Sequence, residues 1–513
     1  MKSTAKTVGL VMFIMLFSRF LAFAGTAVYM TFYGVDNTRI NVYSYAIQFP
    51  NIIFNILGTA LTIVVIPIFA GYIGTNQKDR AYKFADNITS LSIALTILLS
   101  IIGIAIAPLI ISLTKFKTDG FDYAVMALQI MFPVMIFYAM NYVLQGILQS
   151  LGRFAMPALV SIPSSLIVIL YVFLLGGKYG VTGLLIATFI GLAMQALILI
   201  PPLYRTDYRF KPSFDYKNED IKRAFKLIPP ILIGTSAYQL NMLFNITITA
   251  NFKNTVTLMS FVQNTILYSV LAVIYSLTAV IFPKLTMLAA RGEMDNFKLQ
   301  VLKVLKTVVF LLIPAAAGFI AVRYQLISFL VGWGKITSDN ISLASSILAL
   351  YALGVTGIGI KEVTDRAFYS LKDTIRPAIN GVIIMLVNIV ASLVLISVMG
   401  VLGIPLAYSI SGVTGAVVIL TMLRKKTGSF GGRSLLVSLF KVAAASMIMF
   451  GCVVAVNYLL GKYTFGGILV DRGIKLIIPV IVGGTVYMVA SCLLGIQEAT
   501  SILYSIRKRL KRA

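Results

Sequence analysis

Apolar segments, each of roughly 20 residues or more, alternate with short polar loops along the whole chain. A helix of about 20 apolar residues is long enough to cross the hydrocarbon core of a membrane. The pattern therefore predicts an all-α polytopic membrane protein with about fourteen transmembrane helices. The expected spans lie near residues 7–33, 40–73, 87–114, 122–148, 157–177, 182–203, 227–250, 255–285, 302–332, 342–369, 378–399, 403–423, 436–461 and 474–496.

A motif in the second half of the chain returns in weaker form in the first half. The segment 364–377 resembles 149–157, and each leads into an apolar segment that ends in a Gly-Val-x-Gly turn, at Gly180 and at Gly400. Six spans per block is an even number, so the two blocks enter the membrane in the same direction. This predicts two parallel six-helix repeats, an arrangement that places the substrate site of many transporters at the repeat interface.

The repeat also predicts the domain organisation. We expect an N-terminal six-helix lobe at residues 1–210 and a C-terminal six-helix lobe at 211–430. The final two helices and a basic cytoplasmic tail, at 431–513, fall outside the repeat. This helix pair is either a simple structural appendage, or it forms a feature that the two lobes do not provide.

Composition supports the membrane assignment. The mean hydropathy is +0.94 and 12% of residues are charged, against about 25% in a soluble globular chain. The net charge of +26 could indicate a nucleic-acid partner, but the basic residues lie in loops between apolar spans, so we expect none. Their concentration in alternate loops predicts that both termini are cytoplasmic.

Several kinds of chemistry are disfavoured by residue content. The chain has no histidine, which excludes imidazole metal sites and His-based catalytic triads. Cys452 and Cys492 lie in apolar segments and are expected to be small core residues rather than a disulfide or metal site. There is no Walker A pattern. We therefore expect neither an enzyme nor a cofactor.

Arg19 is a charged residue in the middle of the first expected span. An unpaired arginine at that depth costs about 2.5–3.5 kcal/mol on insertion scales, so it usually faces a partner or a water-filled cavity. Either it snorkels or pairs structurally, or its guanidinium contacts an anionic substrate in a central cavity. Phosphate suits the second role because guanidinium binds it with bidentate geometry.

Amide side chains recur on several spans at four-residue spacing, which places both members of a pair on one helix face. Interhelical hydrogen bonding explains each pair about as well as contact with a hydroxyl-rich sugar headgroup does. The candidate cavity residues, besides Arg19, are Asn51, Asn55, Asn141, Gln145, Gln239 and Asn264.

Charged residues gather near the end of the tenth span. The spacing from Glu362 to Arg366 allows an intrahelical ion pair. Asp365 lies between them, and Asp373 lies in the loop that follows. For these four residues we favour a gating or structural role over direct substrate binding.

Across its whole length the chain resembles the MurJ/MviN lipid II flippases of the multidrug/oligosaccharidyl-lipid/polysaccharide exporter superfamily. The most distinctive shared motif is Arg366-Ala-Phe-Tyr-Ser-Leu-Lys-Asp-Thr-x-x-Pro377. Other matching segments are Phe17-Ser18-Arg19-x-Leu21, Phe49-Pro50-Asn51, Ile66-Pro67-Ile68-Phe69-Ala70-x-Tyr72, Arg153-Phe154-x-x-Pro157 and Gly334-Lys335-Ile336-Thr337.

The resemblance implies a flippase that moves undecaprenyl-pyrophosphate-linked peptidoglycan precursor from the inner to the outer leaflet of the bacterial cell membrane. It implies two lobes around a cationic cavity, a groove for the polyprenyl tail formed by the final helix pair, and lobe rocking for alternating access. The membrane potential or a monovalent cation gradient would supply the driving force. Membrane lipid and cell-wall synthesis proteins are the other expected partners.

This chain departs from the family pattern at several charged positions. Residues 22–26 lack the charges usual in the first helix, and Gln263-Asn264 replaces Asp-Arg. Asn41, Phe54 and Thr59 also stand where charges are usual, so Arg19 is the expected cavity arginine that carries over. The alternatives are a flippase for another lipid-linked oligosaccharide, a drug or cation antiporter, and a non-transporting scaffold for cell-wall synthases.

Overall fold

The computed structural model describes residues 2–501 except 152, 154, 205, 207 and 216–218. The basic tail at 507–512, and Gly152 and Phe154 of the weaker motif copy, lie outside the described residues. Every regular element in the described part is a helix, as the sequence predicts. Ten segments in it are long and apolar enough to cross a membrane, and the longest of them, Ile375–Thr427, has 53 residues. The expected number of fourteen spans stays a prediction.

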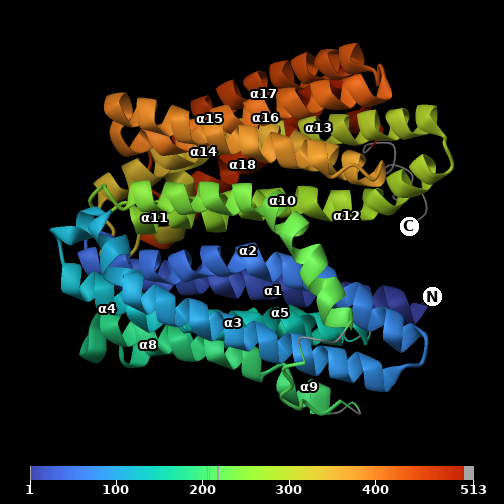
Figure 1. Ribbon diagram of the computed structural model, residues 1–513. Coiled ribbons are helices and arrows are strands. Elements are labelled where there is room, and N and C mark those ends of the chain that lie inside the picture. Colours follow the sequence, from blue (N-terminus) through green and yellow to red (C-terminus); the bar gives the residue numbers. More distant parts are fainter. Residues whose placement is uncertain are drawn as a thin grey trace. The chain divides into compact units, whose positions relative to one another are not determined.

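The chain divides into two compact units, Met1–Leu258 and Met259–Ala513 (Figure 1). The boundaries at residues 210 and 430, which rest on the sequence repeat, stay predictions. The first unit contains α1 (Lys2–Tyr33), α2 (Thr38–Gly74), α3 (Lys78–Ser112), η1 (Lys115–Lys117), α4 (Phe121–Met131), α5 (Val134–Ser150), α6 (Ala155–Leu159), α7 (Ser161–Leu174), α8 (Gly176–Leu197), α9 (Ile200–Tyr204) and α10 (Glu219–Thr249).

Helix α2 is the centre of the first unit, where it packs against α3, α4, α5 and α10. Its buried face carries large aromatic side chains, among them Tyr45, Phe54 and Phe69, each at most 1% exposed. Tyr45 packs edge-on against Phe116 of η1, and Phe54 packs against Tyr138 of α5. Burial of such rings supplies much of the packing energy of the unit.

Polar residues of the third turn of α3, among them Asp86 and Asn87, are buried, which the hydropathy pattern does not predict. Asp86 accepts hydrogen bonds from the Tyr208 hydroxyl at 2.9 Å and from the backbone N–H of Lys211 at 3.0 Å. Asn87 accepts a third from the backbone N–H of Asp215 at 2.7 Å. The segment before α10 therefore lies along α3, and it satisfies polar groups that would otherwise be costly to bury.

The second unit is built around α14. It contains α12 (Tyr268–Ala290), α13 (Met294–Val331), α14 (Ser338–Ser370), α15 (Ile375–Met399), η3 (Gly400–Leu402), α16 (Gly403–Thr427), α17 (Gly432–Gly461) and α18 (Ile468–Leu493). The short helix α11 (Val256–Ser260) spans the division, and the π-helical turn η2 (Phe261–Leu267) follows it.

Helix α14 packs against α12, α13 and α16, and α16 in turn lies beside α15 (Figure 1). The α14–α16 contact is close because small residues face each other. A Cβ atom at Gly357 would lie 2.6 Å from the carbonyl oxygen of Gly412. Small residues of this kind let membrane helices approach closely. The final helices, α17 and α18, pack on each other and on α13.

The two predicted Gly-Val-x-Gly turns have the same backbone conformation. Gly180 has φ 59° and ψ −149°, and Gly400 has φ 60° and ψ −138°. Both lie in a region that is essentially restricted to glycine, because any Cβ would clash with the backbone. Each turn ends one helix and begins the next. This shared conformation at corresponding positions supports the sequence repeat.

Candidate functional site

An amide network joins α2 to α5 in the first unit. Asn55 donates a hydrogen bond to the side-chain oxygen of Asn51 at 2.9 Å, and the Tyr142 hydroxyl donates to the side-chain oxygen of Asn55 at 2.9 Å. The two asparagines are half-buried. Sequence spacing predicted the Asn51–Asn55 pair. Tyr142 was missed, because its partner lies on another helix and no local pattern marks it.

The remaining amide candidates of this unit are placed separately. Asn141 is buried and Gln145 is half-buried on α5, while Gln239 is half-buried on α10. The side-chain oxygens of Asn141 and Gln239 are buried with no hydrogen-bond partner among the described residues. The same holds for Asn241 and Asn245, also on α10. Such oxygens are acceptors for water or for substrate hydroxyls, because unsatisfied buried polar groups are costly.

Arg19 has an exposed side chain on α1. Its neighbour Ser18 is buried and donates a hydrogen bond to the carbonyl oxygen of Ala158 at 3.0 Å, where α1 packs on α6. Successive residues of a helix point about 100° apart, so the contact at Ser18 directs the guanidinium away from α6. The charge is therefore available to a ligand.

Asn41 and Phe54, two of the positions that depart from the resembled family's charged pattern, have packing and hydrogen-bonding roles within the first unit. Asn41 is buried, donates to the carbonyl oxygen of Val35 at 2.7 Å, and accepts from the backbone N–H of Thr257 at 3.1 Å. Phe54 is fully buried against Tyr138 and Tyr142. The Thr59 side chain lies outside the described part of the structure.

In the second unit, Asn264 is half-buried in η2. π-Helical turns interrupt α-helices at a cost and are often found at functional sites. Asn264 therefore remains a candidate cavity residue.

The charged cluster on α14 differs from its predicted pairing. The expected Glu362–Arg366 ion pair is wrong. Lys361 makes the ion pairs instead, with its Nζ 2.7 Å from Asp365 Oδ2 and 3.5 Å from Glu362 Oε1. The Arg366 guanidinium lies near the rings of Phe282 and Tyr369, 5.9 and 6.0 Å from their centroids. Lys361 and Asp365 are also four residues apart, and their side chains point toward each other in the packed interior. The Arg366 side chain points toward the aromatic rings instead.

Asp373 ties three segments together after α14. Its Oδ2 is 2.5 Å from Arg376 Nη1 on α15 and 2.5 Å from Lys426 Nζ near the end of α16. Both cations also lie about 6 Å from the Phe368 ring. Burial acts to raise the pKa of the Asp373 carboxyl, but hydrogen bonds from Lys426 and Arg376 outweigh it and hold that pKa below its usual value.

The lowered pKa gives a test by pH. A carboxyl whose pKa is lower in the folded state contributes stability above its unfolded pKa, about 3.9, and loses it as the pH falls through the folded value. We expect Asp373→Asn to lower the free energy of unfolding by about 1 kcal/mol at pH 7, since both partners are partly exposed. As the pH falls from about 4 through the lower folded pKa of Asp373, the difference between the variant and the wild type should shrink to zero. Thermal unfolding across pH measures this, with exposed Asp119→Asn as the control. A difference that persists unchanged into acid would contradict it.

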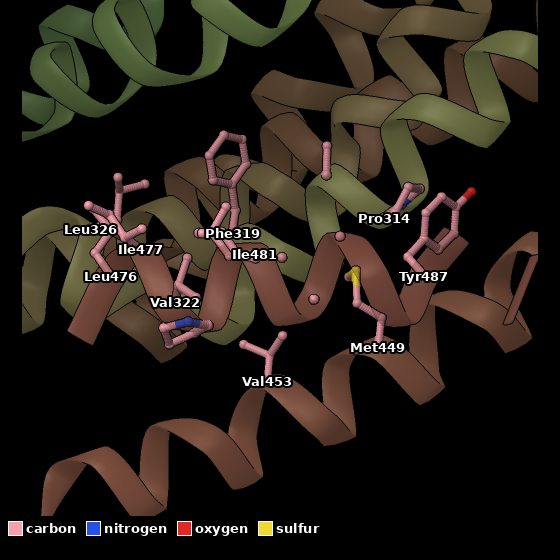
Figure 2. Close-up of a pocket in the computed structure, with 16 residues that line it drawn as sticks. Pro314, Phe319, Val322, Leu326, Met449, Val453, Leu476, Ile477, Ile481 and Tyr487 are labelled. Carbon is pink, nitrogen blue, oxygen red and sulfur yellow. The ribbon is translucent and has the colours of Figure 1, made fainter. Parts of the chain in front are cut away.

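An apolar groove lies between α13 and the two final helices (Figure 2). It has a volume of about 520 Å³. Pro314, Phe319 and Leu326 of α13 line one side, and Leu476 and Tyr487 of α18 lie along its length. Met449 and Val453 of α17 complete it. The lining is almost wholly hydrocarbon, so the groove suits a long apolar chain and not a polar headgroup.

Comparison with known proteins gives one consistent family. The family model described as "Lipid II flippase MurJ" matches residues 31–470. A "Probable lipid II flippase MurJ" of Rhizobium tropici is 24% identical over 491 residues, covering 92% of this chain and 90% of the relative. One of Bdellovibrio bacteriovorus is 23% identical over 400 residues, covering 76% of each chain.

Solved structures agree on the fold. "Lipid II flippase MurJ, inward closed conformation" matches with a TM-score of 0.77 and 22% identity, covering 94% of this chain and 98% of that one. An inward-facing multidrug resistance MATE transporter of the MOP superfamily matches with a TM-score of 0.67 and 16% identity, covering 80% and 95%. The chain therefore has the fold shared by these exporters.

Proposed function

Because the chain belongs to the lipid II flippase MurJ family, we propose that it moves lipid II, the undecaprenyl-pyrophosphate-linked peptidoglycan precursor, from the inner to the outer leaflet of the bacterial cell membrane. Transport, rather than catalysis, is the assigned role. Both termini are proposed to be cytoplasmic, since the most basic loops fall on that side. The substrate is the main partner, and cell-wall synthesis proteins are proposed as further ones.

The groove of α13, α17 and α18 is the observation that carries the substrate assignment. A polyprenyl tail is a long hydrocarbon that must stay in an apolar setting while its headgroup crosses the membrane. The groove offers that setting where the final pair, which lies outside the repeat, packs on α13, and this gives the final pair a purpose. An antiporter for small drugs or cations would not need it, so lipid-linked substrates are favoured.

The headgroup contacts are proposed on the residues described above. Arg19 would contact the pyrophosphate, because its guanidinium is exposed and pairs with phosphate bidentately. The Asn51–Asn55–Tyr142 network and the amides at Asn141, Gln145, Gln239 and Asn264 would contact sugar hydroxyls. Glu362, Asp365, Arg366 and Asp373 are proposed to act in gating. Asp373 would do so through its ion pairs with Arg376 and Lys426, which join the end of α14 to α15 and α16.

Filling the groove should stop transport without unfolding the protein. Gly318 and Gly484 line it, and a Cβ at either meets nothing within 4 Å. Leucine at both positions should reduce lipid II flipping at least tenfold, since the tail loses its apolar contacts. Flipping of fluorescent lipid II in proteoliposomes measures this.

Gly451→Leu is the matched control. Gly451 lies on α17, has the same open surroundings and does not line the groove, so this variant should flip at the wild-type rate. Equal rates for the groove variants and the control would contradict a role of the groove in transport.

The membrane potential is the proposed driving force. An inside-negative potential favours outward movement of an anionic headgroup by about 2.3 kcal/mol per charge per 100 mV. We expect an imposed potential of that sign to raise the flipping rate in proteoliposomes, and a reversed potential to lower it. A monovalent cation gradient is the competing source of energy. Rates that follow sodium and ignore the potential would favour that source instead.

A further inference from the structure

A second, polar pocket lies at the base of the final helix pair. It has a volume of about 180 Å³ and is lined by side chains from α13, from α17 and from the turn after α18. We call it the basal pocket; its polar lining consists of Lys306, Ser434, Ser438, Lys441, Gln497 and Glu498. None of these residues belongs to the candidate substrate site.

The basal pocket presents charges of both signs that are not neutralised by each other. Among the described residues, no salt bridge involves Lys306, Lys441 or Glu498. Lys441 donates one hydrogen bond to the carbonyl oxygen of Leu494 at 2.8 Å, which fixes its position and leaves further N–H donors. Lys306 and Glu498 are half-buried, so a ligand that pairs with them gains more than one on an open surface.

The pocket lies on the same helices as the apolar groove, α13 and α17, about two helical turns away. Lys306 precedes Pro314 on α13 by about 12 Å of helix, and Lys441 precedes Met449 on α17 by the same distance. Pro314, Met449 and Tyr487 lie together at one end of the groove in Figure 2. A lipid whose headgroup lies in the pocket can therefore extend an apolar chain along these helices to the groove.

We propose that the basal pocket binds the headgroup of a zwitterionic aminophospholipid, with its phosphate against Lys306 and Lys441 and its ammonium against Glu498. The serine hydroxyls would donate further hydrogen bonds to the phosphate. The proposed topology places this end of the helices at the cytoplasmic leaflet, where basic pockets between membrane helices bind lipid headgroups.

The pocket's size and charge argue for this occupant over the lipid-linked substrate. A volume of about 180 Å³ is below the roughly 300–1,000 Å³ of sites that enclose drug-sized ligands, so a disaccharide does not fit. A pyrophosphate would bring two or more negative charges toward Glu498, which repels them. A phosphodiester matches the lysines in sign, and an ammonium matches the carboxylate.

Native mass spectrometry of the purified full-length protein tests the proposal. The probes are phosphatidylethanolamine, phosphatidylglycerol and phosphatidylcholine with identical acyl chains, and undecaprenyl pyrophosphate as a fourth. We expect phosphatidylethanolamine to be retained best. Phosphatidylcholine has the same charges but no N–H to donate to Glu498, so it should be retained less.

Three variants separate the contacts. Lys306→Met should reduce retention of phosphatidylethanolamine and phosphatidylglycerol alike, by roughly tenfold for one lost charge-assisted hydrogen bond. Glu498→Gln should remove the preference for phosphatidylethanolamine over phosphatidylcholine without reducing retention of phosphatidylglycerol, which also shows that the variant is folded. Lys303→Met, one turn away on α13 and exposed outside the pocket, should match the wild type.

Three outcomes would overturn the proposal. The first is equal retention of the ethanolamine and choline lipids by the wild type. The second is equal loss in Lys306→Met and Lys303→Met, which would indicate general attraction of anionic lipid. The third is stronger, Lys306-dependent retention of undecaprenyl pyrophosphate, which would assign the pocket to the substrate. None of these outcomes depends on transport, so the test of the basal pocket is independent of the test of the proposed function.

Discussion

Lys361→Met is expected to lower the free energy of unfolding by about 3–5 kcal/mol, the cost of leaving a buried charge without its partner. Lys361 is the shared cation of Asp365 and Glu362 on α14. The Asp365 side chain is 7% exposed, and its Oδ1 has no hydrogen-bond partner among the described residues. Without Lys361 two neighbouring carboxylates would face each other, because the Arg366 guanidinium lies near aromatic rings instead.

Three variants test this account. In Lys361→Met/Asp365→Asn one of the two carboxylates is removed with the cation, so this variant should recover at least half of the lost stability. Lys361→Arg, which keeps the charge, should lose less than Lys361→Met. Thermal unfolding in detergent measures all four proteins. If the double variant is no more stable than Lys361→Met, uncompensated charge is not the cause of the loss.

The second large effect concerns transport. Arg19→Ala should reduce lipid II flipping by roughly 10- to 100-fold, since one hydrogen-bonded charge contact is worth about 1.5–3 kcal/mol. Folding should be unaffected, because the Arg19 side chain is exposed on α1. Flipping by purified protein in proteoliposomes, measured beside thermal unfolding, separates the two effects.

Two further variants define the contact at Arg19. Arg19→Lys keeps the charge but loses bidentate geometry, so its rate should lie between those of the wild type and Arg19→Ala. Arg433→Ala removes an exposed arginine in the first turn of α17 and should flip normally. Wild-type flipping by Arg19→Ala would mean that the guanidinium does not hold the substrate, and would favour a non-transporting role for the chain.

The positions of the long helices could be predicted from sequence because membrane-spanning segments must be continuously apolar. The expected spans at 302–332 and 378–399 correspond to α13 at Met294–Val331 and α15 at Ile375–Met399. Helix α3 begins at Lys78, before the expected span at residue 87, because its first turns are charged and exposed. Asp86 is buried by a segment more than 100 residues later, which hydropathy cannot predict.

The candidate site was predictable only where partners share a helix. Four-residue spacing found Asn51 and Asn55, which are hydrogen-bonded. The same rule gave the wrong pair at Glu362 and Arg366, since it says which residues are neighbours and not which side chains meet. Tyr142 and Lys426 were missed because their partners come from other helices. The apolar groove likewise requires three helices in contact, and only the family resemblance indicated it.

Complementation tests the central claim most directly. The chain is expressed in bacteria depleted of their own lipid II flippase, and survival is scored together with labelling of lipid II in the outer leaflet. The proposed function predicts rescue with restored labelling, despite uncharged residues at Asn41, Phe54 and Gln263. Death without labelling, in cells where the protein is inserted in the membrane at normal levels, would contradict lipid II transport by this chain.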